Sequence, residues 1–283
     1  MASKNYRRKP IAKRKSNTTS KWIFYLISFV LFLFVAIGIY KFRDGFLYYL
    51  GFKTDKNVET LSKEERKLAD IRIYEVLHKH DEKAIGFDVS EYQSEIDWEQ
   101  TYHIDESFEL SFVFIRATAG KNKVDSRFKE NWKASKEREL IRGAYHYYRP
   151  NENSIEQAEN FIKTVKLQKG DLPPVLDIEK LPKSQSIDSL KVGLRRWLKK
   201  VEKHYKVKPI IYSGESYYTD FLKKEFSEYP LWIANYNFWR NDLESDWQFW
   251  QFTEKAQIQG IEGMVDVNIF NGDKNKLLLK CIR

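Results

Sequence analysis

Two acidic residues with a spacing suited to acid catalysis, Asp177 and Glu179, follow the apolar run 174–176. Residues two apart in a β-strand point to the same face, so these carboxylates would share a face, with Cα atoms about 6–7 Å apart. Two acids held this close titrate differently, because one favours its neutral form while the other stays ionised. Such a pair can protonate a glycosidic oxygen and stabilise the charge that develops on the sugar. The alternative is a capping or surface role, since Asp-x-Glu arises by chance in many proteins.

Two further acids, Asp88 and Asp266, lie in other short apolar segments. If these segments are strands of one barrel, their carboxyl-terminal ends meet at one mouth and bring the four carboxylates together. Acids among aromatic rings suit a carbohydrate, whose C–H faces pack on rings while its hydroxyls need polar partners. The residues expected to contact the substrate are Arg116, Tyr145, Tyr212, Trp232, Tyr236 and Gln251.

Several of these side chains also have a structural interpretation. Arg116 could serve as an ion-pair partner of acids, and the rings of Tyr145, Tyr212 and Trp232 could fill the barrel. His146 is expected to be a hydrogen-bonded core or pocket-wall residue rather than a ligand or a base. No cofactor is expected, and a metal site is disfavoured because the sequence lacks oxygen-rich loops with several close ligands.

The elements that must position these residues are short apolar runs separated by amphipathic segments. The candidate strands are 84–89, 112–117, 141–147, 174–178, 209–213, 231–234, 247–252 and 265–269, and the clearest helical patterns are 125–138, 155–165 and 188–205. This alternation predicts an α/β fold with a mainly parallel sheet. Eight strands in roughly two hundred residues favour a TIM-like β/α barrel, irregular where the last connections are short. An open doubly wound sheet is the alternative, although no Gly-rich phosphate loop follows the first strand.

The first forty residues differ from the rest of the chain. Residues 1–21 carry eight Lys and Arg and no acid, and residues 22–40 contain no charged residue. At about 1.5 Å per residue, the uncharged run just crosses a hydrocarbon core of roughly 30 Å. We therefore expect 1–21 to be a cytoplasmic tail and 22–40 an uncleaved transmembrane signal anchor, with everything after it outside the cytoplasm. The alternative, a cleaved signal peptide, has a shorter apolar core.

The overall charge of +9 comes from this N-terminal segment, because the rest of the chain has 41 Lys and Arg against 40 Asp and Glu. No nucleic-acid partner is therefore predicted. The single cysteine, Cys281, excludes an internal disulfide and a Cys-based metal site. Residues 41–82 are interpreted as a stalk with a helix that begins at the N-cap Ser62, and residues 83–283 as the catalytic domain.

Six segments in a fixed order resemble glycoside hydrolase family 25, the lysozymes that cleave 1,4-β links after N-acetylmuramic acid. These segments are 86–90, 114–118, 143–146, 174–179, 231–234 and 265–272. The resemblance covers about residues 83–274 and implies that Glu179 is the general acid, while Asp177, Asp88 and Asp266 line the cleavage subsite. The family commonly has an acidic residue where this chain has Ala119, which we interpret as a change in substrate binding.

The resemblance implies a bacterial muramidase with peptidoglycan strands as substrate. The predicted anchor adds that it is membrane-bound and remodels the cell's own wall, with cell-envelope proteins as possible partners. Asp177 would either meet the developing charge directly or orient the 2-acetamido group of the substrate as an internal nucleophile. We favour the second route, because the strand spacing places Asp177 beside the acid. A catalytically weak glycan-binding scaffold is an alternative of a different class, and hydrolysis of another amino-sugar polymer such as chitin is a third.

Overall fold

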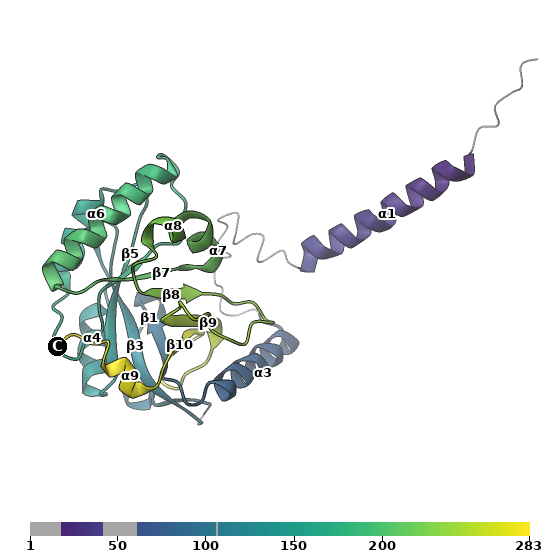
Figure 1. The fold of residues 1–283 in the computed structure, drawn as a ribbon. Coiled ribbons are helices and arrows are strands. Elements are labelled where there is room, and N and C mark those ends of the chain that lie inside the picture. Colours follow the sequence, from purple (N-terminus) through teal and green to yellow (C-terminus); the bar gives the residue numbers. More distant parts are fainter. Residues whose placement is uncertain (1–17, 42–60, 106) are drawn as a thin grey trace, which may run out of the picture. The chain divides into compact units, whose positions relative to one another are not determined.

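The computed structural model describes residues 18–41, 61–105 and 107–283. The chain divides into two units, 1–56 and 57–283. In the first unit, helix α1 (Thr18–Lys41) contains the whole predicted span 22–40 (Figure 1). Among the described residues, no helix combines the length and the apolar character needed to cross a membrane. The anchor and its orientation stay predictions, and the predicted tail before residue 18 and stalk segment 42–60 lie outside the described residues.

In the second unit, eight strands form a closed ring, because β1 pairs with both β3 and β10 while the others pair in chain order. The strands of the ring are β1 (Ile85–Val89), β3 (Phe108–Ala119), β5 (Ile141–Tyr147), β6 (Val175–Asp177), β7 (Ile210–Gly214), β8 (Leu231–Ala234), β9 (Phe249–Ala256) and β10 (Val265–Phe270). All eight predicted strands are thus present, and the closed TIM-like barrel is confirmed. Two short strands, β2 (His103–Ile104) and β4 (Lys123–Val124), pair with β3 beside the ring.

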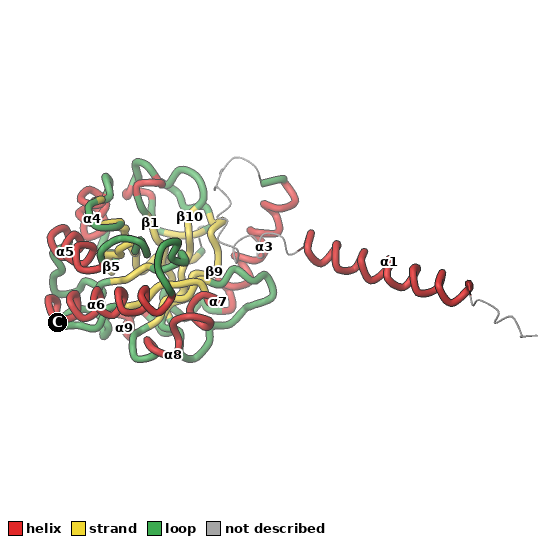
Figure 2. The backbone as a smooth tube through the Cα atoms, turned by 90° about the horizontal axis from the view of Figure 1, so that it is seen from above, coloured by secondary structure: helices red, strands yellow, loops and turns green. Residues whose placement is uncertain are grey.

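The helices lie outside the strands (Figure 2). They are α4 (Phe128–Glu137), α5 (Ser154–Thr164), α6 (Ile187–Tyr205), α7 (Glu215–Tyr217), the π-helical turn η3 (Tyr218–Leu222), α8 (Lys223–Phe226) and α9 (Lys274–Leu278), with 3₁₀ turns η1 (Glu91–Gln93) and η2 (Trp98–Gln100). The three predicted helical patterns correspond to α4, α5 and α6. Loops join β8 to β9 and β9 to β10, so the barrel is irregular at its last connections, as predicted.

Strand β10 runs against both of its neighbours, whereas all the other pairs in the ring are parallel. Its connection from β9 covers only residues 257–264, which is too short for the crossover that a parallel strand needs. Asp266 was predicted to lie at a carboxyl-terminal strand end, and this prediction is wrong. Asp266 lies near the start of β10, and the reversed direction brings it to the same rim as the carboxyl ends of the parallel strands.

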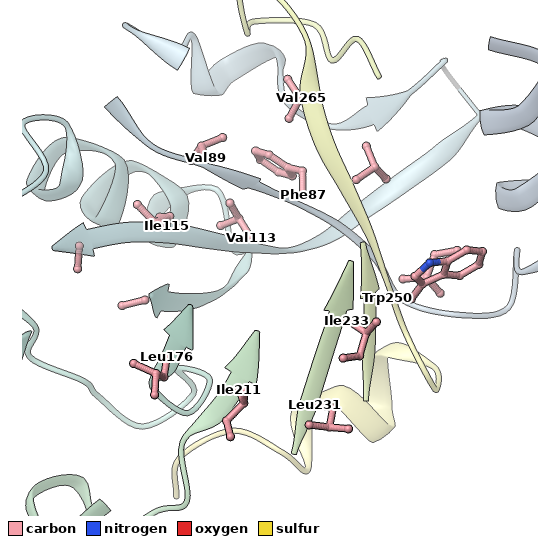
Figure 3. Packing of buried hydrophobic residues seen from close by; sticks show 14 of the residues in the cluster. Phe87, Val89, Val113, Ile115, Leu176, Ile211, Leu231, Ile233, Trp250 and Val265 are labelled. Carbon is pink, nitrogen blue, oxygen red and sulfur yellow. The ribbon is translucent and has the colours of Figure 1, made fainter. Parts of the chain in front are cut away.

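Alternate residues of each strand face the helices or the barrel interior. The outward set forms the larger apolar cluster, which includes Phe87, Val113, Ile115 and Ile233, all buried (Figure 3). This layer holds the amphipathic helices on the strands. The inward set forms a plug of aromatic rings that fills the barrel below the acidic rim.

The plug is built from Phe112 and Phe114 on β3, with Trp232 and Phe249 from the opposite strands. Phe114 stacks on Trp232 with ring centroids 4.3 Å apart, and Phe249 meets Phe114 edge-on at 5.1 Å. A Cβ at Gly143 would lie 2.5 Å from the ring of Phe114. The glycine therefore makes room for the ring, and the packed interior provides a rigid floor under the site.

Helix α3 (Lys63–Lys79) begins at the predicted N-cap. The Ser62 hydroxyl accepts a hydrogen bond from the Glu65 N–H at 3.2 Å, and the Glu65 carboxylate accepts one from the Ser62 N–H at 2.9 Å. The helix buries Val76 and Leu77 and contacts β9. Helix α3 therefore belongs to the second unit and packs on the barrel, while the predicted division into a stalk at 41–82 and a catalytic domain at 83–283 stays a prediction.

Candidate active site

Three of the four predicted carboxylates lie around one half-buried tyrosine, Tyr145, at the barrel rim. Asp88 on β1 is the register partner of Asp266 on β10, and Asp177 ends β6. Burial raises the pKa of Tyr145, on β5, well above its ordinary value; the charges of all three acids raise it further, while Arg116 opposes them. Asp88, Asp266 and Asp177 thus lie at the same end of the barrel, and the rim gathers acids that are up to 178 residues apart in sequence.

Glu179 joins this group through the neighbouring tyrosine of β5. Tyr147 is the register partner of Asp177. Burial raises the pKa of Tyr147, and the charges of Asp177 and Glu179 raise it further. Strand β6 ends at Asp177, so Glu179 lies in the following loop and is half-buried, not in the strand as predicted. The loop position gives the predicted acid access to solvent, whereas Asp177 is buried.

Asp88 is held by two buried amide side chains. Its Oδ2 accepts hydrogen bonds from Gln251 Nε2 at 2.7 Å and from Asn268 Nδ2 at 2.8 Å. Gln251 and Asn268 are themselves 2% and 0% exposed, so both amides are committed to this contact. Hydrogen bonds to the charged form favour a carboxylate, and this arrangement therefore supports Asp88 as an oriented anion.

A second layer of aromatic side chains fixes those two amides. The Trp232 indole donates to Asn268 Oδ1 at 2.7 Å, and the Tyr212 hydroxyl donates to Gln251 Oε1 at 2.7 Å. The Tyr236 hydroxyl also donates to Gln251 Oε1. With their carbonyl oxygens bound in this way, the amides must present their N–H groups to Asp88.

The structure separates the predicted substrate contacts into two groups. Tyr212, Trp232 and Gln251 are between 2% and 7% exposed, so they support Asp88 from within the barrel. Tyr236 is 37% exposed and Tyr145 is half-buried, and both remain open to a ligand at the rim.

Arg116, also predicted to contact substrate, is engaged in ion pairs. Its Nε lies 2.8 Å from Asp125 and its Nη2 lies 3.0 Å from Glu91. The guanidinium also lies 4.6 Å from the ring centroid of Tyr92, which is 77% exposed. Burial opposes the ionisation of Glu91, but hydrogen bonds from Lys123 and Ser126 and the charge of Arg116 lower its pKa to about 2. Arg116 thus holds the segment that follows β1 and presents Tyr92 at the surface.

His146 occupies the core, as expected. Its Nδ1 lies 2.7 Å from the Thr118 hydroxyl and its Nε2 lies 3.1 Å from Gln157 Oε1. Its ring stacks on Trp197 with centroids 5.5 Å apart. Burial lowers the pKa of His146 to about 3, so the ring is neutral and serves packing, not proton transfer.

Asn268 and Tyr147 were not among the predicted site residues. Asn268 could have been found, because it lies two residues after Asp266 and so shares its face of β10. Tyr147 lies two residues after Tyr145 on β5 by the same rule. Over the described part of the chain, no group of three or more His, Cys, Asp or Glu side chains is arranged to hold a metal ion.

Comparison with known proteins connects this rim to a family. Residues 87–261 match Glycosyl hydrolases family 25. The chain belongs to this family. The family 25 match covers every strand from the second half of β1 to the end of β9, so it includes Asp88, Asp177 and Glu179, whereas Asp266 lies just beyond it.

Individual relatives support the assignment of this chain to family 25. Lysozyme M1 of Streptomyces globisporus is 33% identical over 208 residues, which is 68% of this chain and 69% of that protein. The uncharacterized protein YegX of Escherichia coli K12 is 44% identical over 194 residues, 68% of this chain and 71% of that protein.

Solved structures match as well. The family 25 glycosyl hydrolase of Bacillus anthracis superimposes with a TM-score of 0.64 at 29% identity, covering 72% of this chain and 95% of that one. The bacterial lysozyme of Streptomyces coelicolor gives a TM-score of 0.63 at 28% identity, covering 70% and 97%. The chain is therefore a glycoside hydrolase of the lysozyme, or muramidase, type, with peptidoglycan as its class of substrate.

Proposed function

We propose that the chain hydrolyses the 1,4-β bond between N-acetylmuramic acid and N-acetylglucosamine, with Glu179 as general acid. The observation that carries this proposal is the convergence of the carboxylates at one rim: Asp88 and Asp266 are register partners on β1 and β10, and Asp177 ends β6, two residues before Glu179. The acid and its partner therefore line one stretch of the rim. Glu179, the more exposed of the two, protonates the leaving glycosidic oxygen.

Asp177 assists from the same side of the sugar. It lies two residues before Glu179 and directly beside Tyr147 in the sheet, and in this mechanism it orients the 2-acetamido group of the substrate. The acetamido oxygen then attacks the anomeric carbon as the bond to the leaving oxygen breaks, and water later opens the cyclic intermediate. Asp88 and Asp266 position the sugar and stabilise the positive charge on the ring.

The proposal is tested by Glu179→Gln, which keeps the shape of the side chain and removes its proton. Clearing of a peptidoglycan suspension should fall by at least about a hundredfold, a typical contribution of a general acid. The matched control is Glu82→Gln, an exposed residue that precedes β1 at the opposite end of the barrel. Lysis by Glu179→Gln at the parental rate would refute the assignment.

Mass spectrometry of the released fragments tests the bond. Fragments with N-acetylmuramic acid at the reducing end are expected, and cleavage of chitin oligomers instead would favour another amino-sugar polymer. Binding to peptidoglycan without any released fragment would favour the alternative of a glycan-binding scaffold.

We also propose that residues 22–40 anchor the protein in a membrane with the N-terminus in the cytoplasm and the barrel outside. The support is the uncharged run itself and the eight cations that precede it. The full chain should sediment with membranes and expose its barrel to protease added outside, whereas residues 57–283 should remain in the supernatant. Recovery of the full chain in the soluble fraction would contradict the anchor. Such a tether would confine hydrolysis to the cell's own wall, near other envelope proteins.

A further inference from the structure

The loop that follows β8 presents two large aromatic side chains to solvent. Trp239 is 82% exposed and Phe238 is 42% exposed, and their ring centroids lie 5.1 Å apart. Tryptophan is highly buried on average, so such exposure on a loop held by hydrogen bonds marks a contact surface. Flat aromatic rings suit the C–H faces of sugars.

This loop is continuous with the catalytic rim. It leaves β8 at Asn235, and Tyr236 then donates its hydroxyl to Gln251, the residue that holds Asp88. Trp239 is three residues farther along, which places its Cα at most about 11 Å from that of Tyr236. A polymeric glycan that occupies the rim therefore extends within reach of Trp239.

Helix α3 holds the loop in place. The guanidinium of Arg72, a residue only 7% exposed, donates to the Phe238 carbonyl at 2.9 Å and to the Arg240 carbonyl at 3.0 Å. It also donates to Asn241 Oδ1 at 3.3 Å. One buried, planar cation is thus committed to three acceptors of the loop, an arrangement that a lysine cannot reproduce.

Two further contacts hold the loop after β8 in place. His80, just after α3, places its Nε2 2.8 Å from the Asn241 carbonyl oxygen. On the barrel side, Arg240 pairs with Glu215 at 3.3 Å. Helix α3 lies outside the family match of residues 87–261, so this support comes from the segment that precedes the family domain.

We propose that Phe238 and Trp239 form a platform for the peptidoglycan strand beyond the cleaved bond, and that Arg72 is the positioning residue that holds this platform. The proposal rests on the peptidoglycan hydrolysis proposed above. The glycan is the occupant because the platform continues the rim through Tyr236 and because a wall polymer is longer than the rim itself. In this arrangement, α3 couples the segment nearest the predicted anchor to substrate binding.

The first test measures binding without cleavage. In the Glu179→Gln background, Trp239→Ala should weaken the sedimentation of the protein with insoluble peptidoglycan by about tenfold, the effect of losing a central aromatic contact. The matched control is Leu279→Ala, an exposed apolar residue (69%) after α9, which should leave binding unchanged. Equal binding by the Trp239 variant would overturn the platform. A loss of self-association instead of glycan binding, seen by sedimentation velocity, would also overturn it by assigning the surface to a second copy.

The second test separates positioning from general stability. With Glu179 intact, Arg72→Met should raise the KM for polymeric peptidoglycan several-fold more than the KM for a short soluble fragment. Adding Trp239→Ala to Arg72→Met should raise the KM for polymeric peptidoglycan little further, because both changes remove the same contact. Arg72→Lys should restore part of the loss. Additive effects, or equal losses on long and short substrates, would contradict the positioning role.

These measurements also distinguish the two proposals. If Arg72→Met does not fold, Trp239→Ala, an exposed substitution, still decides the platform. If the parental protein releases no muramic acid fragments, the proposed function fails, while the binding series in the Glu179→Gln background continues to report on the platform.

Discussion

Asp88 and Asp266 stand directly opposite each other in the antiparallel pair of β1 and β10. Side chains of such partners project from the same face of the sheet, and like charges in this position destabilise the pair. The protein keeps both acids and surrounds Asp88 with two buried amide donors, from Gln251 and Asn268. We infer that the two opposed charges lower the stability of the fold and are retained because the rim needs them, as is expected at functional sites.

Asp266→Asn should therefore separate stability from activity. Removal of one charge from the opposed pair should raise the free energy of unfolding by up to about 1 kcal/mol, while kcat falls because charge stabilisation at the rim is reduced. Urea unfolding and peptidoglycan clearing measure the two effects. Asp81→Asn, in an exposed turn, is the control and should change neither. A variant that is both less stable and fully active would show that Asp266 has a purely structural role.

Asn268→Ala should weaken the hydrogen bonding that orients the Asp88 carboxylate. The substitution removes the 2.8 Å bond to Asp88 and the acceptor of the Trp232 indole, leaving a buried N–H without its partner. We expect a loss of about 1–3 kcal/mol in the free energy of unfolding and at least a tenfold lower kcat. The control is Asn275→Ala, which is exposed on α9. Parental kcat in Asn268→Ala would mean that the orientation of Asp88 does not matter for the reaction.

Much of the site was predictable because strands carry their side chains with a period of two. The continuous apolar run before Asp177 identified a buried strand, and the carboxyl ends of parallel strands meet at one rim. Eight strands, three helices and the N-cap at Ser62 follow from such local signals. A closed barrel could be predicted from the number and order of the strands alone. Once the barrel is closed, acids at the carboxyl ends of its parallel strands must lie at one rim.

Tertiary contacts account for what the sequence did not reveal. The reversed direction of β10 depends on its short connection from β9. The sequence pattern of β10 is the same as that of the parallel strands, so it does not indicate the reversal. Trp232 and Gln251 have the chemistry of sugar contacts, and only their burial shows that they support Asp88 instead. The attachment of α3 to the loop after β8 joins residues more than 160 apart, for which no local pattern exists.

Arg116→Lys should reveal whether Arg116 is a structural or a substrate residue. Lysine can pair with Asp125 or with Glu91 but cannot match both, so we expect a loss of about 1–3 kcal/mol in the free energy of unfolding. The control, Arg127→Lys, affects the exposed pair with Glu130 and should cost less than about 1 kcal/mol. A raised KM with unchanged stability would instead identify Arg116 as a substrate contact.

His146 should make the fold sensitive to moderate acid. Its pKa is lowered by burial from 6.5 to about 3, so between these pH values the unfolded chain binds a proton that the folded chain does not. The stabilising contribution of the neutral ring is therefore complete above about pH 6.5 and decreases as the pH falls toward 3, by at most about 1.4 kcal/mol per pH unit. Urea unfolding of residues 57–283 at successive pH values measures this slope.

His146→Gln isolates this contribution from that of the acids. Glutamine retains polar atoms for Thr118 and Gln157 but does not titrate, so the variant should lose stability near pH 7 and yet show a shallower decline between pH 6.5 and 4. His103→Gln, at an exposed position, should keep the parental slope. If His146→Gln declines as steeply as the parent, the acid sensitivity originates in other groups, and the buried imidazole is not the one that takes up the proton on unfolding.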